Sequence, residues 1–187
     1  MEGEDLRLLS KKLTPNDICA EFLALSVVEH SFSPDLGIRV ELNTTGATIS
    51  DTGRGMRLHP DSGDTMSHAE RALTSCYPCL PSDPDTERTL LDMIWRDRGS
   101  LGPALANFAC PSLTFVSRRR GEAWSQAYRY GVAQSAPFRI GPTDRKGTTI
   151  SFETPGRIEP AAFKRLAADL SVRIPGLRIS LSERAAV

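Results

Sequence analysis

The stretch ISDTGRGM, residues 49–56, places a carboxylate at the end of a β-branched run and two glycines directly after it. A buried, ionised Asp51 is a suitable acceptor for the amino group of a purine, directly or through a water. Gly53 and Gly55 would let the backbone take positive φ and come close to a flat base. An ordinary Asp-Thr-Gly turn explains the same residues, so this motif alone leaves both interpretations open.

Two other segments could complete a nucleotide site. GSLGPA, residues 99–104, sets Gly99 and Gly102 before a helix start, where exposed amides and the helix dipole favour a phosphate chain. RKGTTISFETP, residues 145–155, leads through Gly147 to Thr148, whose hydroxyl could share a water with the aspartate and the base. Each segment also has a purely structural explanation.

Apolar periodicity predicts the elements that must position these residues. A helix is expected from Pro15 and Asn16 to a stop at Pro34, followed by a hairpin with strands at 37–43 and 47–51. Further helices are expected at 64–77 and 85–97, from Pro103 onward, and at 159–174. Further strands are expected in a hairpin at 112–131 that turns near Arg120 and Gly121, then, after a loop, at 147–155 and 177–183. The pattern predicts an α/β (α+β) two-layer sandwich with one largely antiparallel or mixed sheet and helices on one face.

Length and charge limit the class of protein. A chain of 187 residues with 40% apolar residues fits one globular domain. Lys and Arg number 23 against 23 acids, so the total charge calls for neither nucleic acid nor a membrane surface, although a local patch could still bind either. With no apolar run of about 20 residues and no signal-peptide order at the N-terminus, we expect a cytoplasmic protein without a membrane partner.

The four cysteines, at 19, 76, 79 and 110, fit reduced thiols better than a disulfide framework. The alternative is a zinc site built from Cys76 and Cys79 of CYPC. It would have to recruit Cys110 and one of the three histidines, His30, His59 or His68. No second closely spaced pair supports that alternative, which the sequence alone leaves open.

Taken together and in order, the motifs resemble the nucleotide-binding domain of the GHKL ATPases, specifically that of the DNA gyrase B subunit. DTGRGM stands where the family has DNGRGIP, and GSLGPA stands where it has GLHGVG. GPTDRKGTTISF is similar to the family's GxTxxxGTxxxF strand, and the segment from His59, the basic hairpin and the closing helix and strand are similar as well. The resemblance covers nearly the whole chain from about residue 20.

The resemblance implies a Bergerat fold with about eight strands backed by helices, and a base pocket at the Asp51 motif. Asp51 would bind the adenine amino group, next to Gly53. Gly55 and Thr148 would complete the pocket with a water, and Met56 would pack on the adenine ring.

The resemblance also implies a rim and a lid around that pocket. Arg54 would flank the pocket, where the gyrase arginine also meets aminocoumarin inhibitors, and Arg119 would be a second arginine at the mouth. Gly99 and Gly102 would belong to a mobile lid, about residues 78–104, that covers the phosphates.

The chain departs from the family where the chemistry occurs. Ser26 takes the place of the general base, and a hydroxyl without a neighbouring base cannot deprotonate water near neutral pH. His30 replaces the asparagine that ligates Mg²⁺, which prefers oxygen ligands; a hydrogen-bonded histidine lining an unused pocket explains it equally well. Glu29, three residues after Ser26, is a possible substitute base. Pro103 and Ala104 leave fewer lid amides for a triphosphate.

We therefore expect residues 1–187 to form a single GHKL-type domain, with 1–14 as an N-terminal extension and no transducer domain. The predicted function is binding of ATP or another adenine nucleotide, with weak or absent hydrolysis. One alternative is a non-catalytic pseudo-ATPase that acts as a protein-interaction module with an empty or repurposed pocket. Another is a topoisomerase fragment that works only with a separately encoded protein partner. Direct DNA binding is not expected for this chain alone.

Overall fold

The computed structural model describes residues 3–58, 65–75 and 102–184, which form one sheet covered by helices. The helices in this part of the chain are α1 (Gly3–Ser10), α2 (Pro15–His30), α3 (His68–Thr74), α5 (Gly102–Ala109) and α6 (Pro160–Arg173). The strands are β1 (Gly37–Asn43), β2 (Gly46–Asp51), β3 (Leu113–Arg119), β4 (Glu122–Arg129), β5 (Val132–Ala133), β6 (Phe138–Pro142), β7 (Gly147–Glu153) and β8 (Arg178–Glu183). The architecture is the α/β two-layer sandwich predicted from the sequence.

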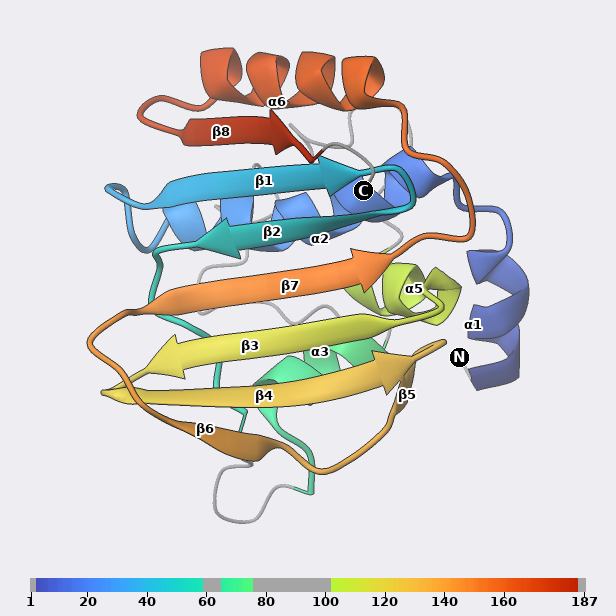
Figure 1. Ribbon diagram of the computed structural model, residues 1–187, viewed down its shortest axis with the longest axis vertical. Helices are drawn as coiled ribbons and strands as arrows, with labels where there is room; N and C mark the ends of the chain where they lie inside the picture. Colours follow the sequence, from blue (N-terminus) through green and yellow to red (C-terminus); the bar gives the residue numbers. More distant parts are fainter. Residues whose placement is uncertain (1–2, 59–64, 76–101, 185–187) are drawn as a thin grey trace.

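The sheet has eight strands and is mixed (Figure 1). Its order is β5-β4-β3-β7-β2-β1-β8, with β6 also paired to β4. The neighbours run antiparallel except β1 and β8, which are parallel because α6 carries the chain back before β8. As a result, β2 and β7 lie side by side at the middle of the sheet, and the end of β2 meets the start of β7.

Helix α2 begins at a capping box. Thr14 Oγ1 accepts from the Asp17 amide, and Asp17 Oδ2 accepts from the Thr14 amide, so two amides that lack helical partners are satisfied. Pro15 follows at a position where its missing N–H costs nothing. The helix ends at His30, four residues before Pro34, close to the predicted bounds.

The core lies between the sheet and the helices α2, α3 and α5, which lie behind the strands in Figure 1. Phe22 of α2 packs on Phe152 of β7 with ring centroids 4.6 Å apart. Leu105 and Phe108 of α5 belong to the same cluster. This packing fixes α2 against the strands that carry the candidate site.

On the other face of the sheet, β2 and β7 carry hydroxyl side chains rather than apolar ones. Thr48 and Ser50 of β2 stand opposite Ser151 and Thr149 of β7, and the Thr48 and Ser151 hydroxyls lie 3.1 Å apart. All four are partly exposed, whereas their strand neighbours Ala47, Ile49, Ile150 and Phe152 are buried. This period of two marks a sheet with one covered and one open face.

Several predicted bounds change in the structure. The helix expected at 64–77 is shorter, because the Ser67 side chain caps α3 by accepting from the Glu70 amide. The helix expected from Pro103 begins one residue earlier, and the one expected at 85–97 lies outside the described residues. The loop expected between the second hairpin and residue 147 contains β5 and β6, and α1 was not predicted.

Within the described residues, no helix has the length and apolar character needed to span a membrane.

Candidate functional site

Asp51 lies at the meeting point of three elements. It ends β2, it is 7% exposed, and its Oδ1 atom accepts from the amides of Gly53 (2.9 Å) and Thr148 (3.2 Å). Its Oδ2 atom accepts from the Ser26 hydroxyl of α2 at 3.1 Å. The turn after β2, the start of β7 and one face of α2 therefore all orient this carboxylate.

All three donors to Asp51 are electrically neutral. Burial raises the pKa of Asp51, the hydrogen bonds from Gly53, Thr148 and Ser26 lower it, and the nearby Glu29 charge raises it; the net direction is upward. A carboxylate has about four lone-pair positions, and Oδ2 accepts one hydrogen bond here. By lone-pair count, one acceptor position of this buried carboxylate is unused within the described residues.

The glycines around Asp51 are required by contacts within the protein. Gly55 has φ 74°, and a Cβ there would lie 2.5 Å from the Arg118 carbonyl oxygen. Gly147 has φ 110°, and its Cβ would overlap the Asp51 carbonyl oxygen. The prediction of positive φ holds for Gly55 and is wrong for Gly53, whose missing side chain makes room for the Glu29 side chain. The glycines alone therefore do not indicate a ligand.

Glu29, the predicted substitute base, is bound to Arg54. Its Oε1 atom accepts from the Arg54 amide (2.7 Å) and Nε (2.9 Å), and its Oε2 atom accepts from Arg54 Nη2 (2.9 Å). The Arg54 guanidinium also lies over the Phe32 ring, 4.1 Å from its centroid. A carboxylate that accepts hydrogen bonds from three N–H groups is poorly placed to take a proton from water. This arrangement therefore favours a structural role for Glu29, which joins α2 to the turn after β2.

The predicted rim arginines collect beside the turn after β2. Arg119 Nη1 donates to the Gly55 carbonyl at 2.8 Å, while its Nε is buried with no hydrogen-bond partner in the described part of the chain. Burial and the charges of Arg120, Arg54 and Arg57 lower the pKa of Arg119. The rim is therefore positively charged.

Met56 is partly buried against the core, and its carbonyl accepts from the Ser117 hydroxyl of β3. This contact joins the turn after β2 to β3, next to the Arg119 contact with Gly55. Whether the Met56 side chain packs on a base remains a prediction.

His30, the predicted metal ligand, lies at the end of α2 against the turn before β8. Its Nε2 donates to the Pro175 carbonyl at 3.1 Å, and its Nδ1 is buried without a hydrogen-bond partner in the described residues. No group of three His, Cys, Asp or Glu side chains in the described ranges could hold a metal ion. The residues placed by the structure therefore do not fit a Mg²⁺ site at His30.

The predicted lid falls mostly outside the described residues. Gly99 lies there, as does the rest of 76–101. Gly102 starts α5 with φ 84°, and Ala104 is buried in that helix. Of the cysteines, Cys19 and Cys110 are buried free thiols, and burial raises the pKa of Cys19 to about 12; Cys76 and Cys79 lie outside the described residues.

Sequence reasoning missed the contribution of Ser26, which stands in the place of the family's general base but whose hydroxyl donates to Asp51. It also did not single out Glu21 of α2, an acid that is 2% exposed inside the apolar run of this helix. A search of protein-family models finds none that matches this chain.

Proposed function

We propose that this chain is a GHKL-type domain, similar to the gyrase B nucleotide domain, that binds ATP or another adenine nucleotide and hydrolyses it slowly or not at all. One observation carries the proposal: Asp51 is a buried carboxylate that receives only neutral donors and keeps an acceptor position on Oδ2. Burying a charge without a cation costs free energy, and a ligand amino group would offset part of that cost.

The chemistry of Asp51 also predicts which base is bound. An ionised carboxylate accepts from the N6 amino group of adenine, whereas guanine presents its O6 acceptor at the same edge. Two acceptors facing each other repel. The site should therefore prefer adenine over guanine nucleotides.

Weak or absent hydrolysis follows from what surrounds Asp51. The Ser26 hydroxyl donates a hydrogen bond to Asp51, and Glu29 is bound by Arg54. His30 bonds to a backbone carbonyl instead of joining a group of metal ligands in the described residues. None of these three side chains is arranged to deprotonate water or to hold Mg²⁺.

The pseudo-ATPase with an empty or repurposed pocket is the second candidate. The observation that favours it is the packing of Gly53, Gly55 and Gly147, because contacts inside the protein account for all three glycines. Under this proposal Asp51 would serve only to join α2, β2 and β7.

Calorimetric titration of the whole chain with a non-hydrolysable ATP analogue distinguishes nucleotide binding from the pseudo-ATPase alternative. The matching GTP analogue is the control for preference between adenine and guanine. We expect heat with the adenine compound, with little change when Mg²⁺ is removed, and affinity for the guanine compound weaker by about tenfold or more. No heat at millimolar adenine compound, or equal affinity for both bases, would reject the nucleotide proposal and leave the second candidate.

A further inference from the structure

Four cations gather at one end of the sheet, at the turn of the β3–β4 hairpin and in the connection from β6 to β7. We call this surface the basic tip; it consists of Arg118, Arg120, Arg145 and Lys146. Arg118 pairs with Gly147 in the register of β3 and β7, so Lys146 and Arg145 follow directly beyond it. The Thr143 amide donates to the Gly121 carbonyl at 2.9 Å, which holds the connection against the hairpin turn.

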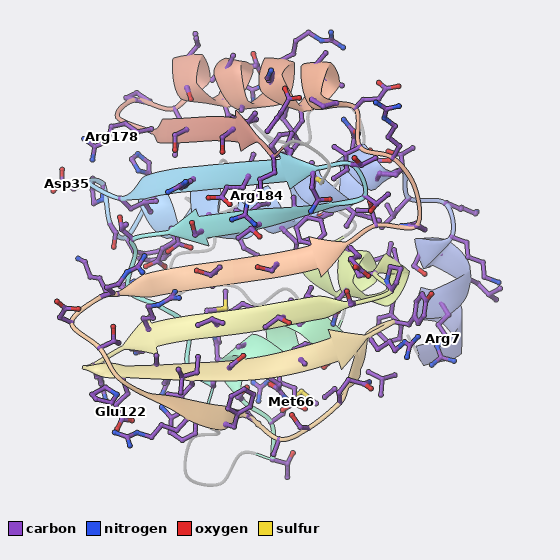
Figure 2. The ribbon with its side chains drawn as sticks, viewed as in Figure 1. Arg7, Asp35, Met66, Glu122, Arg178 and Arg184 are labelled. Carbon is purple, nitrogen blue, oxygen red and sulfur yellow. The ribbon has the colours of Figure 1, made fainter. Side chains whose placement is uncertain are left out.

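The cations of the basic tip have no ion pair within the described residues. Arg118 Nη1 donates to the Thr149 hydroxyl at 2.9 Å, and Arg120, Arg145 and Lys146 are exposed. Glu122, which Figure 2 labels at this end of the sheet, is already bound to Arg139 at 3.0 Å. Asp144 is the acidic residue that the connection itself carries. Four cations therefore face one uncommitted acid.

Cations at the β1–β8 side of the sheet are arranged differently. Glu41 pairs with both Arg39 (2.8 Å) and Arg184 (3.5 Å), and Lys164 of α6 pairs with Glu183 of β8. The chain has no net charge, so the excess at the basic tip is a property of the fold rather than of the composition. Like charges placed together without partners repel, and a polyanion removes that repulsion.

The surface next to the basic tip offers groups suited to nucleic acid. The hydroxyls of Thr149 and Ser50 lie on the open sheet face beside Arg118, and Thr114 lies further along β3 on the same face. Neutral donors of this kind contact phosphate and sugar oxygens. Phe138 of β6 pairs with Ser125 in the register and is 54% exposed, which provides an aromatic face for base stacking.

An acidic peptide fits this end of the sheet less well. A peptide most readily adds as a strand to a free sheet edge. The β6 edge ends in Pro142, which has no N–H, and the β4–β6 pairing shifts register between Ala123 and Trp124. Both features hinder strand addition.

We propose that the basic tip and the adjoining open sheet face bind the phosphate backbone of single-stranded nucleic acid with little sequence preference. The balanced total charge gives no reason to expect a nucleic acid partner, and the local distribution of charge is what leads to the proposal. It does not depend on nucleotide binding at Asp51, which uses the other face of the sheet.

The test is fluorescence anisotropy of the whole chain with a labelled mixed-sequence single-stranded oligonucleotide over a range of salt. A triple variant, Arg120→Asn, Arg145→Ser and Lys146→Ser, removes exposed cations, and asparagine suits the φ of 53° at position 120. Its control, Lys12→Ser, Arg157→Ser and Arg165→Ser, removes the same charge from exposed positions elsewhere. The slope of log K against log salt should fall by about 2 in the first variant and much less in the control.

Three outcomes would overturn the proposal: no binding by the parent chain at low salt, equal weakening in the two variants, or equally tight binding of labelled polyglutamate. Equal weakening would mean that only total charge matters. Tight binding of polyglutamate would assign the surface to an acidic protein. Thermal melting of both variants shows whether either loss reflects unfolding.

Discussion

Two carboxylates lie beside the turn that follows β2, and the fold treats them in opposite ways. Asp51 is buried, receives three hydrogen bonds from neutral donors, and has a raised pKa. Glu29 is partly exposed and accepts three hydrogen bonds, all from N–H groups of Arg54. The distance between the two groups is small enough for the Glu29 charge to raise the pKa of Asp51.

This difference suggests a ligand-binding role for Asp51 and a structural role for Glu29. Arg54 neutralises Glu29 and occupies both of its oxygens, so Glu29 ties the end of α2 to the turn after β2. Asp51 has no cation among its hydrogen-bond donors, so three neutral groups stabilise its buried charge directly. The Arg118 charge acts on it without a direct ion pair. Burying this carboxylate costs free energy, and a fold that retains such a group is expected to use it in function.

The largest expected effect is on stability, at the glycine that supports Asp51. Gly147→Ala should lower the free energy of unfolding by about 3 kcal/mol or more, because φ is 110° and the new Cβ would overlap the Asp51 carbonyl oxygen. Urea unfolding measures the loss. Gly121→Ala is the control, since it has φ 83° but nothing near its Cβ, and should cost about 1 kcal/mol. Equal losses would show that the overlap is relieved easily.

Ser26→Ala should destabilise the fold by about 2 kcal/mol, because it leaves Asp51 Oδ2 buried without its donor. The measurement is again urea unfolding at neutral pH. Ser171→Ala on α6 removes a hydroxyl that bonds its own helix, and should change stability by less than about 0.5 kcal/mol. If Ser26→Ala were equally harmless, the Asp51 carboxylate would not depend on α2.

The raised pKa of Asp51 predicts a pH dependence. The folded chain binds more protons than the unfolded chain from about pH 3.9, where a free aspartate titrates, up to the higher pKa in the fold. Stability carried by this group is therefore fully present below that window and falls as pH rises through it, by at most about 1.4 kcal/mol per pH unit.

Asp51→Asn removes this titration while keeping the shape of the side chain. The difference in unfolding free energy between the parent chain and the variant should shift in favour of the variant as pH rises from 4 to 7. Parallel stability curves over that range would contradict the raised pKa.

The smallest effect is expected at Glu29. Glu29→Gln should cost about 1 kcal/mol or less and depend on salt, because Arg54 is half exposed. Any phosphate release from ATP should remain unchanged in this variant. A drop of about tenfold or more in phosphate release would instead identify Glu29 as the general base and contradict its assignment to a purely structural role.

Local patterns were enough to predict β1–β4, β7, β8, α2 and α6, since alternation and capping residues are visible within a few positions. Strand β6 escaped prediction because Gly141 and Pro142 lie within it and Pro137 precedes it, and these residues favour turns. The site could be predicted only in part. Asp51 and Thr148 could be chosen from their motifs, whereas the hydrogen bond from Ser26, 25 residues before Asp51 along the chain, could not be predicted.

The role of Glu29 was beyond sequence reasoning for the same physical reason. Its pairing with Arg54 spans 25 residues and depends on α2 ending beside β2. The missing side chain of Gly53 admits the Glu29 side chain, and this packing cannot be distinguished in the sequence from room for a ligand. Three-dimensional contacts are needed to distinguish a glycine required by packing within the protein from a glycine that makes room for a ligand.

The most direct test is a calorimetric titration of the parent chain and of Asp51→Asn with a non-hydrolysable ATP analogue. Asparagine can keep the bonds from Gly53 and Thr148 through its oxygen, while it turns an amide donor toward the adenine amino group. The account predicts adenine-nucleotide binding by the parent chain, a loss of about tenfold to a hundredfold in the variant, and no change in Ser50→Ala on the opposite face. Parent-like affinity in Asp51→Asn would contradict it.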